Sequence, residues 1–356
     1  MKNRKFNKNE IHQKFYHHLQ TKVFDALKDK NIKTGSFNFW LKGMVWALVA
    51  YGSYLCLIHT KSAILFWGFY LTFQLAGLLI GFSLGHDASH NTAFKNKQSN
   101  QYLHFFSFLS IGIDPLLWGL RHIRSHHLYA NVEGSDVDID KNPFLRLAPS
   151  HPKKKKHQFQ HFYAPFVYML ALLHSVFLGD WIYLFHKDYE WMRRGIPKKE
   201  LYIRFFIFKI CYFGLILFMP YYFTTFSLTF IFLTYITTSA FTSLLFVVML
   251  VGTHFFYEAE YPESSEDELM STWAVHQLKT SCDWHPNSAW ARYLSGGSNC
   301  HAAHHLFPNI CHTNYDKINH IIENTTQDYG LPYHRMSLID MIKSHFKHLK
   351  KMGLKD

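Results

Sequence analysis

The sequence predicts an all-α integral membrane protein in which four transmembrane helices carry a helical cap on the cytoplasmic side. Two observations lead to this fold class: long segments that are almost free of charge, and basic residues concentrated in the regions around them. At 356 residues, the length alone would also allow one or two soluble domains. The apolar segments decide between the classes, because a helix needs roughly 20 apolar residues to cross a bilayer core.

Four apolar segments have about the length of a membrane span. We expect spans at residues 41–58, 63–84, 201–220 and 222–252. The first lies near the lower limit of length. The third contains Arg204 and Lys209, whose long side chains can reach the interface or face protein. Short turns are expected at residues 59–62 and 220–222.

The distribution of basic residues predicts the orientation of these spans. The two short turns carry a single lysine, Lys61, whereas the longer connections and both ends of the chain are basic. By the positive-inside rule, both termini and residues 85–200 are then cytoplasmic. The apolar segments 102–120 and 162–185 are expected to lie in the interface as amphipathic helices. If one of these two segments crossed the membrane and the other did not, this topology would be wrong.

Three regions follow from this topology. Residues 1–39 form a cytoplasmic N-terminal segment, residues 40–335 the membrane domain, and residues 336–356 a basic cytoplasmic tail. The net charge of +12 agrees with the positive-inside bias and with attraction to anionic head groups. A nucleic-acid partner is not expected, because the basic residues are scattered around membrane segments.

Eight histidines fall into three tight clusters beside the predicted spans. They are His86 and His90; His122, His126 and His127; and His301, His304 and His305. Neutral imidazole is the commonest nitrogen ligand for transition metals, and helix positions three or four apart share a face. A lone histidine is more often a hydrogen-bonded core residue than a ligand. Four crossings put all three clusters on one membrane face, which favours a shared metal site, and eight ligands suit two ions.

The residues around the clusters bear on the identity of the metal. The carboxylate of Asp87 is expected to accept a hydrogen bond from a ligand imidazole. The carboxylates of Asp136 and Asp138 are expected either to orient imidazoles or to form salt bridges with Arg121 and Arg124. The His-Glu-x-x-His motif of zinc hydrolases is absent from the sequence. Imidazole-rich coordination with open positions suits iron and dioxygen, so zinc is expected only as a replacement in purified samples.

The spacings His-x3-His, His-x3-His-His and His-x2-His-His, in this order around paired spans, resemble those of the membrane fatty-acid desaturases. Within them, the chain is similar to the bacterial acyl-CoA (linoleoyl-CoA-like) and front-end branch. The resemblance covers roughly residues 40–335 and includes Gly252-Thr-His-Phe-Phe-Tyr-Glu258 and Trp273-Ala-Val-His-Gln-Leu-Lys-Thr280. It implies removal of two hydrogens from adjacent methylenes of an acyl chain, with dioxygen, two external electrons and a di-iron centre.

The resemblance also implies roles for residues outside the clusters. His276 is expected to be a further ligand, because desaturases carry an additional histidine between the last span and the third cluster. His254 is a weaker candidate for a metal ligand, and it is expected to lie beside the metal ligands rather than to bind the metal itself. The alternative interpretation of His254 is a hydrogen bond to Glu258 one helical turn on.

The implied partners are an acyl-CoA or acyl-lipid substrate and membrane lipid, with the protein in a bacterial inner membrane. A fused haem carrier with His-Pro-Gly-Gly is absent from the sequence, so the electron donor is expected to be separate, a ferredoxin or small haem protein with its reductase. Many front-end desaturases have glutamine at the position of His301, which weakens assignment to that branch. Two alternatives stay open: a lipid or carotenoid hydroxylase, and a metal-stabilised membrane scaffold or receptor.

Overall fold

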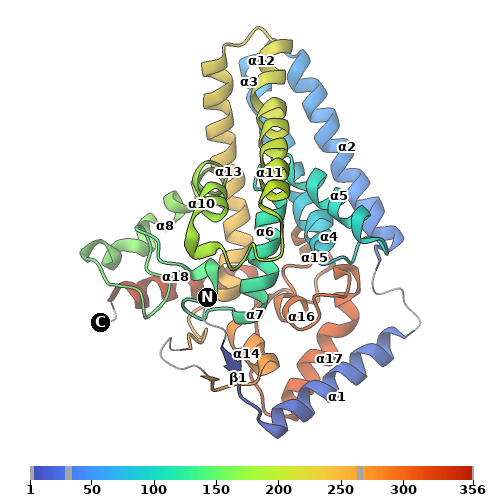
Figure 1. The fold of residues 1–356 in the computed structure, drawn as a ribbon, viewed down its shortest axis with the longest axis vertical. Helices are drawn as coiled ribbons and strands as arrows, with labels where there is room; N and C mark the ends of the chain where they lie inside the picture. The colour runs from blue at the N-terminus through green and yellow to red at the C-terminus, as the bar shows by residue number, and fades with distance from the viewer. Residues whose placement is uncertain (1–3, 29–33, 263–267, 355–356) are drawn as a thin grey trace. The chain divides into compact units, whose positions relative to one another are not determined.

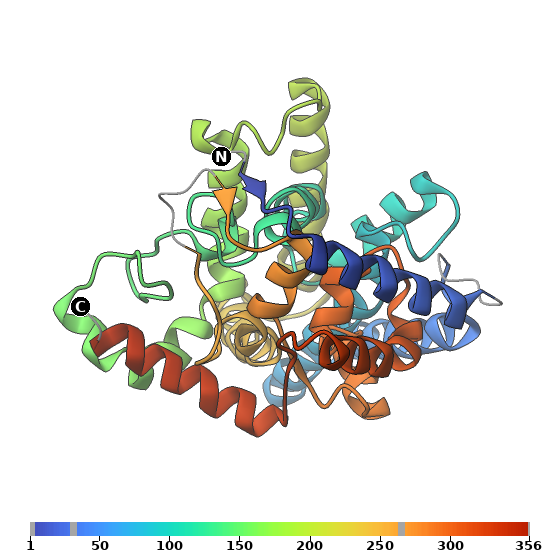
Figure 2. The same cartoon turned by 90° about the horizontal axis from the view of Figure 1, so that it is seen from below.

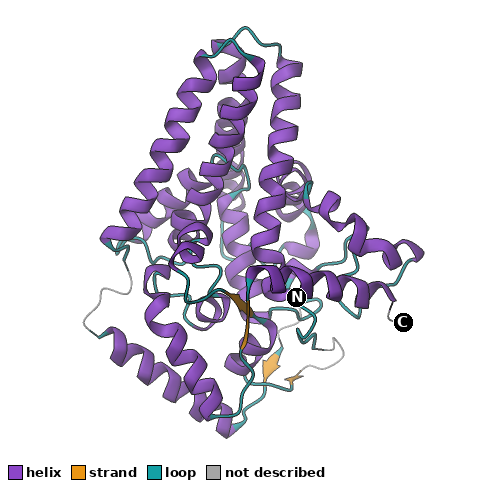
Figure 3. Cartoon of the chain, turned by 180° about the vertical axis from the view of Figure 1, so that it is seen from behind, coloured by secondary structure: helices purple, strands orange, loops and turns teal. Residues whose placement is uncertain are grey.

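The computed structural model describes residues 4–28, 34–262 and 268–354, and most of them are helical (Figure 1, Figure 3). Four short strands form two parallel pairs: β1 (Lys5–Phe6) with β2 (Glu268–Leu269), and β3 (Cys282–Trp284) with β4 (His334–Met336). The predicted helical class is confirmed, although these strands make the strict description "all-α" wrong.

The chain folds into two compact units, each assembled from separated stretches. We call Ser36–Leu120 together with Pro165–Val247 the spanning unit. The remaining stretches, which include Arg121–Ala164 and Val248–Asp356, form the histidine-rich unit.

The spanning unit contains the predicted number of long apolar helices, which run side by side in Figure 1. The four candidate spans are Phe37–His59 (α2), Ala63–Ser89, Lys198–Phe223 and Leu228–His254 (α13). The second joins α3 (Ala63–Ile80), a π-helical turn (Gly81–Gly85) and α4 (His86–Ser89). The third joins α11 (Lys198–Phe213), a π-helical turn (Gly214–Phe218) and α12 (Met219–Phe223). The first three spans are longer than predicted, because residues at their ends continue the helix, whereas the fourth begins six residues later than predicted and is shorter.

The turn predicted at residues 220–222 is wrong, because Pro220 lies inside α12 and the turn follows at residues 224–227. Proline has no N–H and leaves the carbonyl four residues earlier without its helical donor. That carbonyl belongs to Ile216, and it accepts a hydrogen bond of 2.7 Å from the hydroxyl of Tyr70. Tyr54 donates to the neighbouring carbonyl of Leu215 at 2.6 Å. The helix therefore continues through the proline, since both carbonyls find donors in the same unit.

Replacing Tyr70 by phenylalanine is expected to destabilise the spanning unit by about 1–3 kcal/mol, because a buried carbonyl would lose its donor. Thermal unfolding of the purified protein in detergent measures this change. The matched control is Tyr221→Phe, which removes a hydroxyl from a half-exposed side chain on α12 of the same unit. Equal melting temperatures for both variants would contradict the assigned role of Tyr70.

Charged residues are also buried in the spanning unit. Lys209 was expected to reach the interface or to face protein, and it faces protein. Its Nζ lies 2.7 Å from Oδ2 of Asp180 and donates to the carbonyl of Gly112 at 2.9 Å. The same Asp180 oxygen accepts from the backbone N–H of Asp114 at 2.7 Å. Arg204, in contrast, is an exposed residue paired with Glu200.

The two predicted interface segments are each broken into shorter helices. Residues 102–120 fall in α5 (Lys97–Phe108) and α6 (Pro115–Arg121). Residues 162–185 fall in α8 (Gln160–Tyr168), α9 (Ala171–His174), a π-helical turn (Ser175–Gly179) and α10 (Asp180–Phe185). The helix pair Lys155–Tyr168 and Ala171–Phe185 is bent by 71° and is apolar enough to count together as a fifth candidate span. Among the described residues, four helices pass as spans without it.

The histidine-rich unit is built around shorter helices. They are α1 (Glu10–Leu27), α7 (His127–Tyr129), α14 (Trp273–Thr280), α15 (Ala289–Ser295), α16 (His301–Leu306), α17 (Tyr315–Asp328) and α18 (Leu338–Leu354). Helices α1 and α17 lie side by side (Figure 2). Asn9 caps α1, and Phe15, Leu19 and Val23 repeat every four residues on the buried face. This face packs with the alanines of α16, so the core of the unit fixes the third histidine cluster.

Candidate metal centre

Local helix geometry directs the clustered histidines of the histidine-rich unit. The third cluster lies on α16, where His301, His304 and His305 are all buried. The second cluster begins in a π-helical turn (His122–His126) and ends at His127, the first residue of α7. Single π-helical turns inside helices are frequent at functional sites.

Four imidazoles of this unit converge on one point: His126, His254, His301 and His305. One ring nitrogen of each lies within 4.8 Å of the others, and all four residues are buried. Nε2 of His254 lies 2.6 Å from Nε2 of His301 and 3.1 Å from Nε2 of His305. This set joins the second cluster, the end of α13 and the third cluster.

The opposite nitrogen of each of these rings is held by an acceptor. Nδ1 of His254 donates to the carbonyl of Thr280 at 2.7 Å, and Nδ1 of His301 to the carbonyl of Ser298 at 3.1 Å. The acceptor for His305 is Oε1 of Gln277 at 2.8 Å, and the acceptor for His126 is a carboxylate oxygen of Asp136 at 3.2 Å. Carbonyl and carboxylate oxygens only accept, so the proton of each neutral ring is on Nδ1.

It follows that the Nε2 atoms are lone-pair donors that point at one another. Two such lone pairs at 2.6–3.1 Å repel unless a cation lies between them. A transition metal is the cation that a set of neutral imidazoles binds, and outer hydrogen bonds to Nδ1 are the usual support of metal-bound histidine. The residues present therefore fit a metal site.

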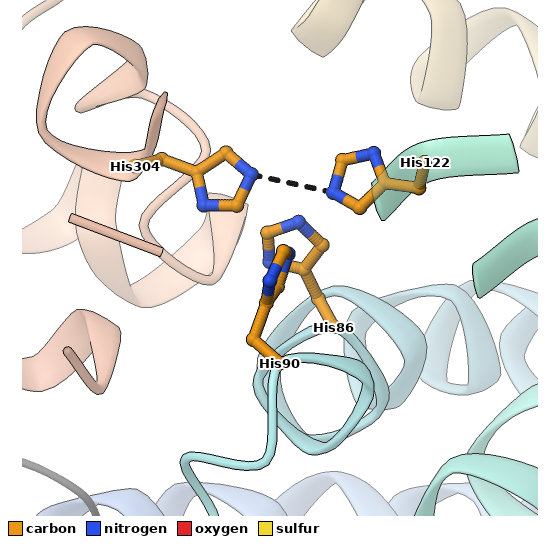
Figure 4. A group of neighbouring side chains, drawn as sticks. All are labelled: His86, His90, His122 and His304. Carbon is orange, nitrogen blue, oxygen red and sulfur yellow. Dashed lines mark hydrogen bonds between the residues drawn. The ribbon is translucent and has the colours of Figure 1, made fainter. Parts of the chain in front are cut away.

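A second convergence in the same unit involves His122, His127 and His304. Nε2 of His127 lies 2.8 Å from Nε2 of His304 and 3.1 Å from Nε2 of His122. The ring nitrogens of His122 and His304 face each other at 3.3 Å (Figure 4). The hydroxyl of Tyr315 lies 3.4 Å from Nδ1 of His304. Since His127, His304 and His305 also form a group of close nitrogens, the two convergences adjoin.

The first cluster belongs to the spanning unit. His86 opens α4 and His90 ends it, and their rings lie 5.2 Å apart on the same helix (Figure 4). Burial lowers the pKa of His90 to about 3, the neighbouring His86 lowers it as well, and the carboxylate of Asp87 opposes both effects. The buried Asp87 therefore acts on His90 electrostatically, while His90 stays neutral and able to bind a metal; the hydrogen bond of Asp87 to a ligand imidazole stays a prediction.

Burial also keeps other imidazoles neutral. It lowers the pKa of His305 well below its ordinary value, and the nearby His127 adds to the effect. His126 is the exception: burial alone would lower its pKa, but the carboxylates of Asp136 and Asp138 raise it. A metal at Nε2 would remove this tendency to protonate, because the same nitrogen cannot hold both.

The positions of His254 and His276 differ from the sequence prediction. His254 lies among the converging nitrogens, whereas His276 belongs to none of the groups found in the described residues. Nε2 of His276 is buried without a hydrogen-bond partner among the described residues, and its ring lies 5.6 Å from that of Phe6. Burial lowers the pKa of His276 to about 4.

The alternative interpretation of His254, a hydrogen bond to Glu258, is wrong. Both ring nitrogens of His254 are engaged elsewhere, and Glu258 accepts from the hydroxyl of Ser344 at 3.2 Å. The physical reason is that α13 ends at His254, so Glu258 is not one helical turn further on. Asp138 is close to His126 at 3.6 Å, but it is partly exposed and pairs with Arg121 at 3.0 Å.

Gln277, Thr280 and Tyr315, which contact the outer nitrogens of ligand imidazoles, were not predicted from the sequence. Gln277 is fully buried next to His276 in the sequence, and this polar residue on an otherwise apolar helix face was the available signal. Thr280 acts through its backbone carbonyl, and no side-chain pattern indicates such a contact.

Replacing Asp136 by asparagine is expected to lower metal affinity by about 10–100-fold, since such outer partners orient the ligand and raise its basicity. Asp136 also accepts from the backbone N–H groups of Asn131 and Asp138 at 2.9 Å, so its place is well defined. Metal content after dialysis against a graded chelator measures the change. Asp138→Asn is the matched control, and an equal loss in both variants would contradict the specific role of Asp136.

The fold and the buried imidazoles define the class of protein: a helical membrane protein with a histidine-rich metal centre. The sequence model of the family described as "Fatty acid desaturase" matches residues 62–337. This chain therefore belongs to the fatty acid desaturase family. The match includes all three histidine clusters and His254.

Curated relatives agree with this family. The chain is 28% identical to an acyl-lipid (8-3)-desaturase of Physcomitrium patens, over 85% of this chain and 63% of the moss protein, so it spans less than two thirds of that relative. It is 28% identical to an sn-1 linoleoyl-lipid 6-desaturase of Arthrospira platensis, over 77% and 74% of the two chains. It is also 28% identical to a probable Delta(5) fatty acid desaturase C of Dictyostelium discoideum, over 96% and 76%. No solved structure matches the chain significantly.

Proposed function

We propose that this protein is an oxidoreductase that introduces a double bond into a fatty-acyl chain, using dioxygen and two external electrons. The observation that carries the proposal is the convergence of Nε2 lone pairs from His126, His254, His301 and His305, whose Nδ1 protons are held outside. The family match gives the reaction class, and the printed names of the relatives, which include acyl-lipid and linoleoyl-lipid desaturases, support an acyl-lipid substrate over acyl-CoA.

We propose two iron ions as the metals, held by the eight clustered histidines and by His254, which takes the role expected of His276. Iron bound there would supply the activation of dioxygen, and zinc would bind the same nitrogens in purified protein. His86 and His90 are assigned to this centre by their chain positions. The first cluster follows α3 after the π-helical turn Gly81–Gly85, and the second directly follows α6, so each starts at the end of a helical stretch.

The residues of the chain have three tasks in this reaction. Asp136, Gln277 and the carbonyl of Thr280 fix the ring orientations and the tautomers. Burial of the converging imidazoles excludes water, and it keeps His305 neutral by lowering its pKa. We assign no amino-acid general acid or base, since the chemistry is supplied by the bound metal and the protein supplies ligation and orientation.

We propose that residues 40–335 act as one desaturase domain in a bacterial inner membrane, with both termini and the centre cytoplasmic. The even number of spans supports this arrangement, because the third cluster must return to the side of the first two. Counting the bent pair Lys155–Tyr168 and Ala171–Phe185 as a fifth span would separate them. Labelling of single cysteines introduced at the exposed positions Lys95 and Asn287, in a variant without the five native cysteines, tests the topology, and labelling from opposite sides would overturn it.

The electron donor is proposed to be a separate protein, a ferredoxin or a small haem protein with its reductase. The basic surface of the chain suits an acidic carrier, because opposite charge speeds association. Reconstitution with each donor and its reductase would show which of them supports oxygen consumption.

The decisive experiment is expression of the gene in a host, with its fatty acids analysed by gas chromatography and mass spectrometry. Desaturation lowers the product mass by about two units and hydroxylation raises it by about sixteen, because the first removes two hydrogens and the second inserts oxygen. A hydroxylated lipid would replace the proposal by the hydroxylase alternative. An unchanged profile, without oxygen consumption by the iron-loaded protein, would favour the scaffold.

A further inference from the structure

We infer that a lysine-lined groove of the histidine-rich unit binds the phosphate head group of an anionic phospholipid. The groove has a volume of about 930 Å³ and is open to solvent. It lies between α18 and the segment that follows α13, and its lysines are Lys343, Lys347, Lys350 and Lys351. It is separate from the metal centre, and its function does not depend on the proposed reaction.

The lysines share one face of α18 for a simple geometric reason. Positions 343, 347 and 350 or 351 follow the spacing of three and four residues that aligns side chains along a helix. The opposite face is buried through Met341, His345 and Leu349. The helix therefore cannot turn its lysines away from the groove without exposing its apolar side.

Three contacts fix α18 against the segment after α13. Nδ1 of His345 lies 2.8 Å from the carbonyl of Phe255, and the hydroxyl of Ser344 accepts from the backbone N–H of Tyr257 at 2.9 Å. Nζ of Lys351 donates to the carbonyl of Tyr257 at 3.2 Å and lies 4.5 Å from the centre of its ring. The walls of the groove are thus held together by hydrogen bonds, and Lys351 is oriented in it.

The groove follows closely after the end of a candidate span in the chain. Tyr257 follows the last residue of a candidate span, His254, by only three residues. Three residues reach at most about 11 Å even when fully extended. The head-group region is roughly 5–8 Å thick on each side of the hydrocarbon core. The wall at Tyr257 is therefore close enough to the end of the candidate span, along the chain, for the groove to meet lipid head groups.

The charges and apolar ends favour a lipid head group as the occupant. Two carboxylates, Glu258 and Asp340, also line the groove, which leaves a surplus of two positive charges from the four lysines and suits one phosphodiester better than a polyphosphate carrier. Ile339 and Leu354 at the two ends of α18 are 64% and 58% exposed. Lysines between exposed apolar residues are typical of a helix that lies in a membrane interface.

The green segment beside α18 in Figure 2 contributes further basic charge. Nζ of Lys153 lies 3.2 Å from the carbonyl of Leu354, and Lys156 lies over the ring of the exposed Phe144. Clusters of four or more basic residues next to a membrane span are the known pattern of anionic-lipid binding. The groove adds a defined concave site to that pattern.

The test uses the full-length protein in detergent and native mass spectrometry, titrated with phosphatidylglycerol and, separately, with phosphatidylcholine. The double variant Lys347→Gln/Lys350→Gln should bind phosphatidylglycerol about thirty-fold more weakly, since each lysine near the lipid surface contributes about five-fold. Binding of phosphatidylcholine should stay the same. The charge-preserving variant Lys347→Arg/Lys350→Arg should keep wild-type affinity.

The matched control is Lys14→Gln/Lys28→Gln, which removes the same charge from exposed positions on and just after α1. An equal loss of phosphatidylglycerol binding in this control would overturn the proposal, because net charge would then explain the effect. Unchanged binding in the groove variant would overturn it as well. Displacement of phosphatidylglycerol by coenzyme A at equal concentration, with higher affinity, would assign the groove to a soluble carrier instead.

Discussion

The variant His304→Ala is expected to lose all measurable turnover and most of its bound iron, while it still inserts into the membrane. Nε2 of His304 lies 2.8 Å from that of His127 and 3.3 Å from that of His122, so this ring takes part in the convergence of the second and third clusters. Loss of an outer partner of a metal ligand costs about 10–100-fold in affinity, and loss of the ligand itself should cost at least about 100-fold.

Two readouts separate this effect from misfolding. Iron per protein is measured by plasma emission spectroscopy, and oxygen consumption is followed with the loaded enzyme. The matched control is His320→Ala, which makes the same substitution at an exposed position of α17. Wild-type iron content in His304→Ala would remove this residue from the centre, whatever the activity.

The second large effect is expected for His254→Gln, which should also abolish activity and lower the iron content. His254 approaches two other imidazoles at 2.6 and 3.1 Å, and its Nδ1 is fixed by the carbonyl of Thr280. Glutamine keeps a side chain of similar reach, but its amide is a poor substitute for a lone-pair nitrogen at a transition metal. The same substitution at His276 is the matched comparison, because both histidines are buried in the same unit.

His276→Gln is expected to retain most of its iron, since no converging nitrogen group of the described residues contains His276. Metal content should therefore rank wild type and His276→Gln above His254→Gln. The reverse order would restore the family-based expectation and contradict the geometry. Equal, complete loss in both variants would show that the two rings act on the metal together.

Much of the fold could be predicted because it depends on local properties of the chain. Four apolar segments of sufficient length predict four spans, and the described residues contain four such helices besides the bent pair. The prediction was wrong about where the spans begin and end, and about a turn at Pro220. A proline usually ends a helix, but here the hydroxyl of Tyr70, which is distant in sequence, satisfies the carbonyl of Ile216.

The three clusters could be identified for the same reason. Spacings of three and four residues align side chains on a helix, so His301, His304 and His305 could be assigned to one face without a structure. The carboxylate of Asp136 was predicted to hold a ligand because it follows the second cluster closely, and it contacts Nδ1 of His126. Contacts between residues that are ten or fewer positions apart in the sequence can be predicted in this way.

Contacts between segments that are distant in the sequence could not be predicted. His254 and His305 are 51 positions apart, and Gln277 and His305 are 28 positions apart. No periodicity relates these residues. A histidine's ligand role depends on the direction in which its Nε2 points, and for His254 that direction is set by the carbonyl of Thr280.

The sequence by itself determined the class of this protein: a multi-span helical membrane protein with clustered imidazoles, because span length and helical spacing are local. Only the tertiary structure decided that His254 joins the converging nitrogens and His276 does not. The same is true of the lysine groove, whose two walls lie about ninety positions apart in the chain. In both cases the physical reason is that packing of the whole unit, and not the neighbouring residues, sets where a side chain points.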